Sequence, residues 1–188
     1  RNPDSPRSGN GPDLNLNMLG RSGAFGILTS VTLKVFRSLP QNRRSYSYLF
    51  RSWNRVLEAV REVAQQQAGL PSVFRISDPE ETDVALKMYG IADTPADTAL
   101  RLLGYAPMQR CLLLGTAEGE RGYCRNLDRI IRRICRRAGA LELTPLRVTQ
   151  RWEESRFRDP YLRDDLHDFG VLIDTLECSV TWSQVEAV

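Results

Sequence analysis

Hydrophobic and polar positions alternate between residues 27 and 36, directly after a glycine-rich turn. One face of this segment carries mostly β-branched and aliphatic side chains: Ile27, Thr29, Val31, Leu33 and Val35. Alternation with a period of two in such residues is typical of a β-strand. We therefore predict a tight turn followed by a strand over residues 27–36. The glycine spacing does not by itself indicate a nucleotide loop, because Rossmann and P-loop glycines open a helix.

Residues 45–148 alternate between short apolar runs and helical stripes. We predict strands over 45–50, 72–76, 110–116 and 141–148, and helices over 52–69, from 78, over 95–103 and over 120–137. Asp78 and Pro79 form a typical helix start, with Glu81 three residues after the cap. The order is β-α-β, an inserted helical pair, then β-α-β. It predicts an α+β fold of the ferredoxin-like type, an antiparallel sheet with helices on one face.

Apolar stripes predict which side of each helix is buried. For the helix that starts at Asp78, the expected stripe is Val84, Ala85 and Met88. For the helix over 120–137, spacing of i, i+3 and i+4 predicts a buried stripe of Leu127, Ile130, Ile131, Ile134 and Cys135. Its opposite side carries five arginines: Arg129, Arg132, Arg133, Arg136 and Arg137. These favour a solvated face over a nucleic-acid or phosphate site, because the net charge of the chain is only +3.

Composition restricts the remaining classes of function. The four cysteines have no Cys-x-x-Cys spacing, so we expect reduced thiols, with Cys111, Cys124 and Cys135 buried, in a cytoplasmic protein. No apolar stretch approaches the roughly 20 residues of a membrane span. The chain does not begin with Met, and we expect it to be a piece of a longer protein. His167, the single histidine, is expected at the surface, and neither a metal site nor a catalytic triad is predicted.

Three blocks of sequence resemble a known family. The block from Gly20 to Thr29 resembles the Gly-Ser-Glu-Gly-(Thr/Ala)-(Leu/Phe)-Gly-Ile-(Ile/Val)-Thr motif at the end of the flavin-binding domain of FAD-linked oxidases of the vanillyl-alcohol oxidase type. It departs from that motif at Arg21 and Ser22, and also at Ser30, where the motif continues with Glu. Residues 156–164 and 174–182 resemble the Arg-Phe-x-x-Pro-Tyr-Leu-Arg-(Asn/Asp) and Asp-Thr-Leu-Glu-Thr-x-x-x-Trp boxes of the alkyldihydroxyacetonephosphate-synthase-like branch.

The resemblance implies a domain organisation and a function. Residues 1–40 would be the C-terminal end of an FAD-binding domain, and 41–188 a cap (substrate) domain that is incomplete at its C-terminus. The whole protein would be an FAD-dependent oxidoreductase acting on a hydroxy-acid, an alcohol or a glycerone-phosphate-like small molecule, and the chain alone would be inactive. In this resemblance, Arg163 and Tyr161 bind the substrate. The positions expected beside FAD are Gly20, Gly23, Gly26 and Ile27.

Two other interpretations stay open. A ferredoxin-like regulatory or dimerisation module without redox activity explains the β-α-β order equally well, although it leaves the three blocks unexplained. A basic nucleic-acid-binding domain is weaker, because residues 111–114 offer no aromatic side chain for stacking. For Arg163, an ion pair with Asp164 or Asp168 is the structural alternative to substrate binding. A homodimer is left open, and no nucleic-acid partner is expected.

Overall fold

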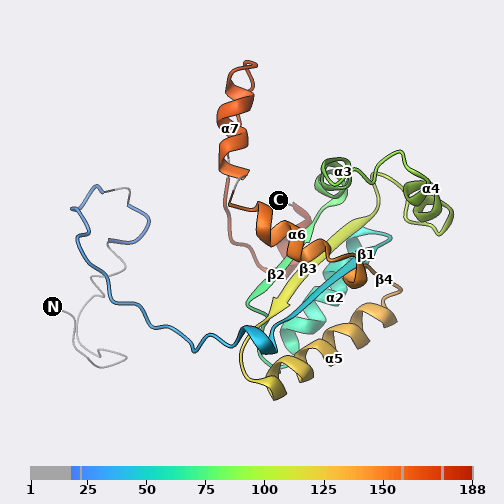
Figure 1. The fold of residues 1–188 in the computed structure, drawn as a ribbon, viewed down its shortest axis with the longest axis horizontal. Coiled ribbons are helices and arrows are strands. Elements are labelled where there is room, and N and C mark those ends of the chain that lie inside the picture. Colours follow the sequence, from blue (N-terminus) through green and yellow to red (C-terminus); the bar gives the residue numbers. More distant parts are fainter. Residues whose placement is uncertain (1–17, 22, 158, 175, 188) are drawn as a thin grey trace. The chain divides into compact units, whose positions relative to one another are not determined.

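The computed structural model describes residues 18–187 apart from residues 22, 158 and 175. Side chains of Asp159, Pro160 and Leu162 are outside that description. The chain divides into two compact units, Arg1–Phe36 and Arg37–Val188, which are treated separately below. Figure 1 gives the order of the helices and strands along the chain.

The first unit, as far as it is described, consists of turns followed by an extended segment. The amide of Ala24 donates to the carbonyl of Arg21 at 2.9 Å, and that of Gly26 to Gly23 at 3.2 Å. Residues 27–36 contain no β-strand, so the predicted strand is wrong for this chain. Ile27 is 91% exposed. The physical reason is the lack of a partner: the described residues of this unit include no other strand whose backbone could complete a ladder.

The second unit is built on a four-stranded antiparallel sheet. Its strands are β1 (Arg44–Phe50), β2 (Val73–Ser77), β3 (Cys111–Ala117) and β4 (Leu141–Glu142). Their spatial order is β2-β3-β1-β4, and every neighbouring pair is antiparallel. The two strands of each β-α-β motif therefore lie on either side of one strand of the other motif. This is the split arrangement that the sequence predicted, and the ferredoxin-like sheet is confirmed.

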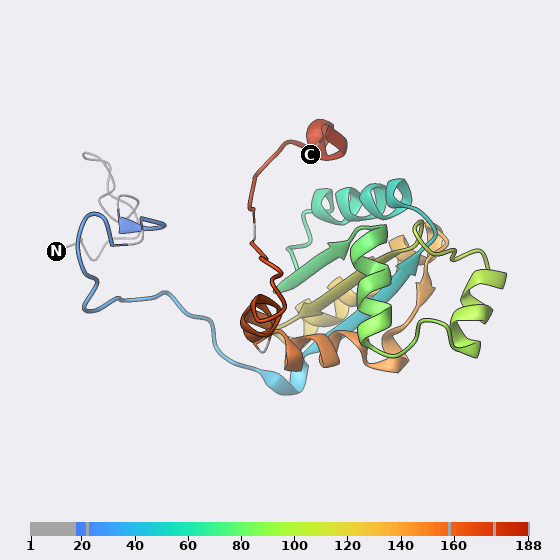
Figure 2. The ribbon, with the colours of Figure 1, turned by 90° about the horizontal axis from the view of Figure 1, so that it is seen from above.

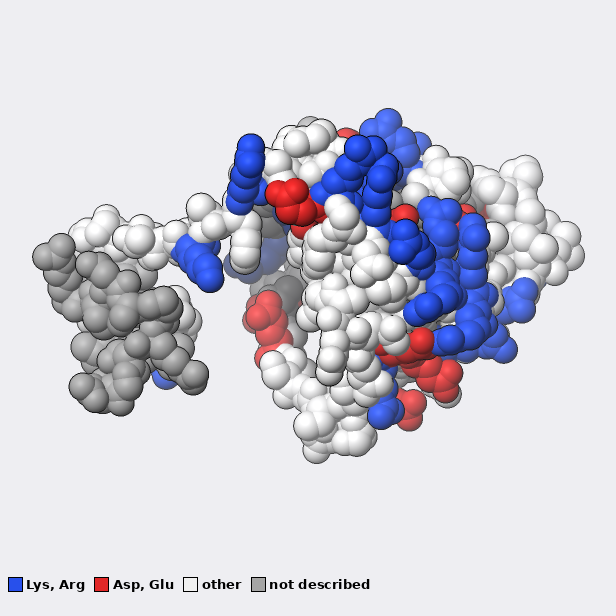
Figure 3. Space-filling view, turned by 90° about the horizontal axis from the view of Figure 1, so that it is seen from below, with Lys and Arg blue, Asp and Glu red and all other residues white. Residues whose placement is uncertain are grey.

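One face of the sheet is covered by α2 (Trp53–Gln65) and α5 (Arg121–Arg137), which also contact each other. Tyr46, Tyr48 and Phe50 point from β1 into this layer, because alternate residues of a strand share a face. The predicted stripe of α5 is largely confirmed: Leu127, Ile131, Ile134 and Cys135 are buried, with Ile130 half-buried. The outward side of α5 carries its arginines, which belong to the densest band of basic side chains in Figure 3.

The other face of the sheet is also covered, which the expected one-sided arrangement did not include. Helix α6 (Val148–Ser155) contacts β1 and β3, and α3 (Pro79–Met88) contacts β2 and β3. Both lie on the side of the sheet away from α5, and Figure 2 shows α3 crossing the strands. The core of this layer consists of Leu49, Tyr105, Leu112, Leu114, Leu143 and Val148. Strand β3 is therefore buried along its whole length.

Helix α3 begins as predicted but buries a different side. The Asp78 carboxylate accepts a hydrogen bond from the Glu81 amide at 2.7 Å, which confirms the cap. Val84 and Met88 are mostly exposed, so the predicted apolar stripe is wrong. The buried residues are Thr82 and Leu86. The Thr82 hydroxyl donates to the Ser77 carbonyl and accepts from the Leu112 amide, and these two bonds decide which side of α3 faces the sheet.

The strand predicted over 141–148 is also largely wrong. It ends at Glu142 and is followed by a 3-10 turn (Thr144–Leu146) and then by α6. Pro145 has no amide hydrogen to donate, so a ladder cannot continue through it. The Ser47 amide donates to the Thr144 hydroxyl instead, and the Thr149 hydroxyl donates to the Tyr46 carbonyl at 2.6 Å. Side-chain bonds thus complete the edge of β1.

The remaining described segments are short. A 3-10 turn (Pro40–Asn42) leads into β1, and α4 (Pro95–Leu102) follows α3. After α6 come α7 (Asp159–His167), an irregular segment, and a final 3-10 turn (Trp182–Ala187). Within the part of the chain that the structure describes, no helix is long and apolar enough to cross a membrane.

Candidate functional site

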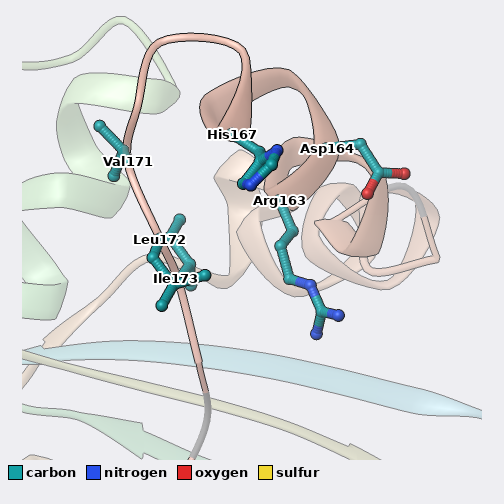
Figure 4. Close-up of a pocket in the computed structure, with 6 residues that line it drawn as sticks. All are labelled: Arg163, Asp164, His167, Val171, Leu172 and Ile173. Atoms are coloured by element: carbon teal, nitrogen blue, oxygen red, sulfur yellow. The ribbon is translucent and has the colours of Figure 1, made fainter.

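A pocket lies between α7 and the segment that follows it. Gly170 has φ of +73°, a conformation that favours glycine, and its amide donates to the His167 carbonyl at 2.9 Å. The Val171 amide donates to the Leu166 carbonyl at 3.0 Å. Together these bonds form a Schellman motif, which ends the helix and turns the chain back. The pocket is lined by Arg163, Asp164, His167, Val171, Leu172 and Ile173 (Figure 4).

The pocket combines a polar side, formed by Arg163, Asp164 and His167, with an apolar side. Arg163 and His167 are four residues apart, so they lie on the same face of α7. Val171, Leu172 and Ile173 come from the returning segment, as Figure 4 shows. The hollow of about 260 Å³ is somewhat smaller than a typical site for a drug-sized ligand. This arrangement suits one anionic group of a molecule with a short aliphatic part.

Arg163 has no acidic partner in the described residues. No ion pair or hydrogen bond joins its guanidinium to Asp164 or Asp168. Asp164 lies beside it on the helix and lines the same pocket. The alternative interpretation, in which Arg163 forms an ion pair with Asp164 or Asp168, is therefore not supported by the described residues. Its five N–H donors stay available for a carboxylate or phosphate, which a guanidinium can bind through two parallel hydrogen bonds.

Tyr161 lies on the same helix but does not line this pocket. It is 68% exposed. Two residues along a helix correspond to a rotation of about 200°, so Tyr161 and Arg163 project to nearly opposite sides of α7. The structure thus brings Arg163 together with His167 rather than with Tyr161. Substrate binding by Arg163 and by Tyr161 stays a prediction.

The four predicted flavin contacts, Gly20, Gly23, Gly26 and Ile27, lie in the first unit. All three glycines have positive φ angles: +65° at Gly20, +83° at Gly23 and +145° at Gly26. A Cβ at Gly20 would meet no atom within 4 Å, and one at Gly26 would lie 3.6 Å from the Met18 side chain. The backbone of this turn is therefore open to close approach by a flat ligand such as a flavin. Flavin binding at these residues stays a prediction.

A cluster of buried charges lies elsewhere in the second unit and was not predicted. The side chains of Arg110 and Asp97 are 2% and 1% exposed, and an ion pair of 2.5 Å joins them. Arg110 also bonds Asp83 at 2.7 Å, and Arg101 bonds Asp97 at 2.5 Å. Both carboxylates of the cluster accept hydrogen bonds from its arginines, and Asp83 also accepts one from the Met108 amide, so we assign the cluster a structural role. Its members come from α3, from α4 and from the position just before β3, and no periodic signal in the sequence connects them.

Sequence reasoning missed most of the pocket lining. His167 was placed at the surface, where it is indeed exposed, but it also borders the pocket. Val171, Leu172 and Ile173 were not singled out. Gly170, directly after a helix rich in charged residues, is the signal that could have predicted the reversal. Among the described residues, no group of three His, Cys, Asp or Glu side chains could hold a metal ion.

The fold and the pocket together define an α+β domain with a split β-α-β sheet and an arginine-containing site on a helix outside that sheet. Residues 39–188 match the family model of FAD linked oxidases, C-terminal domain. This match covers most of the chain, and the chain belongs to that family. The family is one of FAD-linked enzymes, so FAD is the cofactor that membership implies.

Relatives point to the same branch that the sequence motifs resemble. The chain is 24% identical over 190 residues to alkyldihydroxyacetonephosphate synthase of Dictyostelium discoideum, covering 97% of this chain and 31% of the relative. For the synthase of Caenorhabditis elegans, identity is 27% over 193 residues, covering 96% and 31%. An uncharacterised FAD-linked oxidoreductase of Escherichia coli K12 is 32% identical over 76 residues, covering 40% and 16%. The chain thus spans about a third of the length of these synthases.

Solved structures give the same fold. One structure of an alkyldihydroxyacetonephosphate synthase superposes with a TM-score of 0.74 at 23% identity, covering 96% of this chain and 34% of the other. A second gives a TM-score of 0.63 at 22% identity, covering 79% and 29%. At this identity the likeness establishes the fold.

Proposed function

We propose that the full-length gene product is an FAD-dependent oxidoreductase and that residues 41–188 are its cap (substrate) domain. Residues 1–40 would then be the end of the FAD-binding domain. The observation that carries the proposal is the pocket with Arg163, which has no ion pair among the described residues, in a chain whose family is that of FAD-linked oxidases. Family membership also favours this proposal over a regulatory module without redox activity.

The proposed substrate is a small anionic molecule: a hydroxy-acid, or an alcohol or glycerone-phosphate-like compound that carries a carboxylate or phosphate. Arg163 would bind the anion, and His167 could donate a further hydrogen bond from the same face of α7. The apolar side chains of Val171 and Leu172 would contact the adjoining aliphatic part. Binding of the anion by a positioned guanidinium fixes the orientation of the substrate.

The glycine turn fits a role in holding the cofactor. The backbone around Gly20, Gly23 and Gly26, together with Ile27, would lie beside FAD. When bound, the flavin supplies the acceptor for the electrons of the substrate. The residues of this chain contribute binding and orientation.

The test is anaerobic reduction of the enzyme-bound flavin in the full-length protein, with glycolate, lactate and glycerone phosphate as substrates. Arg163→Ala should leave the flavin content unchanged. It should raise the substrate concentration needed for half-maximal reduction by about 10- to 150-fold, since a hydrogen bond to a charged group contributes about 1.5–3 kcal/mol. Arg163→Lys should recover part of that loss, because it keeps the charge without the planar fork.

Arg151→Ala is the matched control. Arg151 is an exposed arginine on α6 outside the pocket, so the variant should behave as the wild type. Equal reduction by Arg163→Ala and the wild type, with every substrate that the wild type accepts, would refute the role of Arg163.

A further inference from the structure

Helix α5 carries a regular row of arginines on its outward side. Arg121, Arg125, Arg129, Arg133 and Arg137 follow one another at intervals of four residues, and Arg132 and Arg136 lie beside them. Against these seven cations, α5 contains one acidic residue, Asp128. Residues four apart are neighbours on a helix surface, so the row is continuous. It belongs to the densest band of basic side chains in Figure 3.

The arginines of α5 differ in whether they form ion pairs with acidic side chains. Arg132 and Arg136 both form ion pairs with Glu142, and Arg137 pairs with Glu62. Four members of the row are exposed and have no ion pair among the described residues: Arg121, Arg125, Arg129 and Arg133. We call these four the arginine row. It extends for about 18 Å along the helix, with steps of about 6 Å.

The arginine row destabilises the free helix. Like charges at i and i+4 repel each other, and the row contains three such neighbouring pairs. Glu142 and Glu62 pair with other arginines of α5, whereas no ion pair among the described residues neutralises a member of the row. An external anion with several charges would remove this repulsion along the whole row at once.

The chemistry of the surrounding helix surface restricts that anion. Gly122 and Asn126 are exposed between the arginines, Asp128 is half-buried there, and the apolar side of α5 is buried against the sheet. The aromatic residue of α5, Tyr123, is two residues from both Arg121 and Arg125, so it projects to the other side of the helix, and its hydroxyl donates to the Leu70 carbonyl. The row itself therefore offers no ring that could stack on bases, as single-stranded nucleic-acid sites require. No aliphatic side chain of α5 is exposed to enter a bilayer. Binding must therefore rest on contacts between guanidinium groups and phosphates.

We propose that the arginine row binds the surface of a membrane that contains anionic phospholipid. A convex helix touches a plane along one line, and headgroups that diffuse in that plane can gather under each arginine. A basic cluster of this size on an amphipathic helix is typical of such binding, at about tenfold or less in affinity per arginine. Contact through headgroups alone gives a peripheral, salt-sensitive association.

The test is co-sedimentation of the full-length protein with vesicles of phosphatidylcholine, with and without about one third phosphatidylglycerol. Binding should need the anionic lipid at about 0.05 M salt and should be lost at about 0.5 M. Arg125→Gln/Arg129→Gln should weaken it by about 30-fold, at about 1 kcal/mol for each arginine. Glutamine keeps a good helix propensity, and unchanged circular dichroism would verify that α5 remains folded.

The control variant is Arg37→Gln/Arg151→Gln, which removes the same charge from exposed positions outside α5. It should bind within about threefold of the wild type, because neither Arg37 nor Arg151 belongs to the arginine row. Equal losses in the two variants would overturn the proposal, as would wild-type binding by the α5 variant. Tighter binding to a duplex DNA than to the anionic vesicles, at the same salt, would also overturn it.

Discussion

The buried ion pair between Arg110 and Asp97 allows a quantitative test of the packing described above. Both side chains are almost completely buried, and their Nη1 and Oδ1 atoms are 2.5 Å apart. Asp97→Ala leaves the guanidinium buried with Asp83 as its remaining acidic partner. Removing one member of a buried pair costs about 3–5 kcal/mol, because the other charge loses its compensation.

The double variant should be less damaging than the two single changes suggest. In Asp97→Ala/Arg110→Met neither charge of the pair remains, so no partner is left as an uncompensated buried charge. We therefore expect Asp97→Ala and Arg110→Met each to lose about 3–5 kcal/mol and the double variant to lose clearly less than their sum.

The assay is urea unfolding of the full-length protein, followed by circular dichroism and analysed as a double-mutant cycle. In thermal unfolding, the single variants should lower the Tm of the transition that involves this domain by roughly 6–20 °C, at about 2–4 °C for each kcal/mol in a domain of about 150–250 residues. Single variants that each lose less than about 1 kcal/mol, or strict additivity in the double variant, would refute the reasoning.

Three further predictions concern the second unit. Gly115→Ala should destabilise it by about 1–3 kcal/mol in urea unfolding, since a Cβ there would lie 2.2 Å from the Tyr46 ring; Gly122→Ala, in open space on α5, should be neutral or stabilising. Burial alone would raise the pKa of Asp97, but hydrogen bonds from Arg110 and Arg101 outweigh it and lower the pKa below the usual 3.8. This stabilisation is present above about pH 4 and is lost as pH falls through the lowered pKa. Between neutral and acid pH, the free energy of unfolding should therefore fall less in Asp97→Asn than in the wild type. Burial raises the pKa of the Cys111 thiol to about 12, so a thiol reagent at mild alkaline pH should modify exposed Cys178 first; faster loss of Cys111 would contradict the fold.

The sequence correctly predicted the helices and strands whose apolar residues are the ones that the structure buries. Helix α5 has a dense apolar stripe and β3 a continuous apolar run, and both lie where they were expected. Local capping signals were equally informative at α3, because Asp78 acts on an amide three residues away. Short-range chemistry of this kind needs no knowledge of the tertiary structure.

Predictions failed where distant contacts decide the outcome. The alternation over residues 27–36 describes a strand, but a strand forms only when another strand accepts its hydrogen bonds. In α3, the polar residue Thr82 is buried because its hydroxyl bonds Ser77 and Leu112, whereas Val84 is exposed. Hydropathy cannot predict that a hydroxyl group will be buried through bonds to a sheet.

The candidate site was predicted in part. Arg163 was identified through its sequence box, and the structure adds its position in a pocket beside His167. The apolar wall at Val171 and Leu172 could not be derived from hydropathy, since it depends on the reversal at Gly170. Tyr161 illustrates the limit of motif reasoning: closeness in sequence to Arg163 does not bring the two side chains to one side of a helix.

The visible absorption spectrum of the purified full-length protein tests the central claim most directly. A yellow protein with flavin absorbance, bleached on anaerobic addition of a hydroxy-acid or glycerone-phosphate-like substrate, is the result that we predict. A folded, colourless protein that takes up no added FAD would contradict the assignment as an FAD-dependent oxidoreductase.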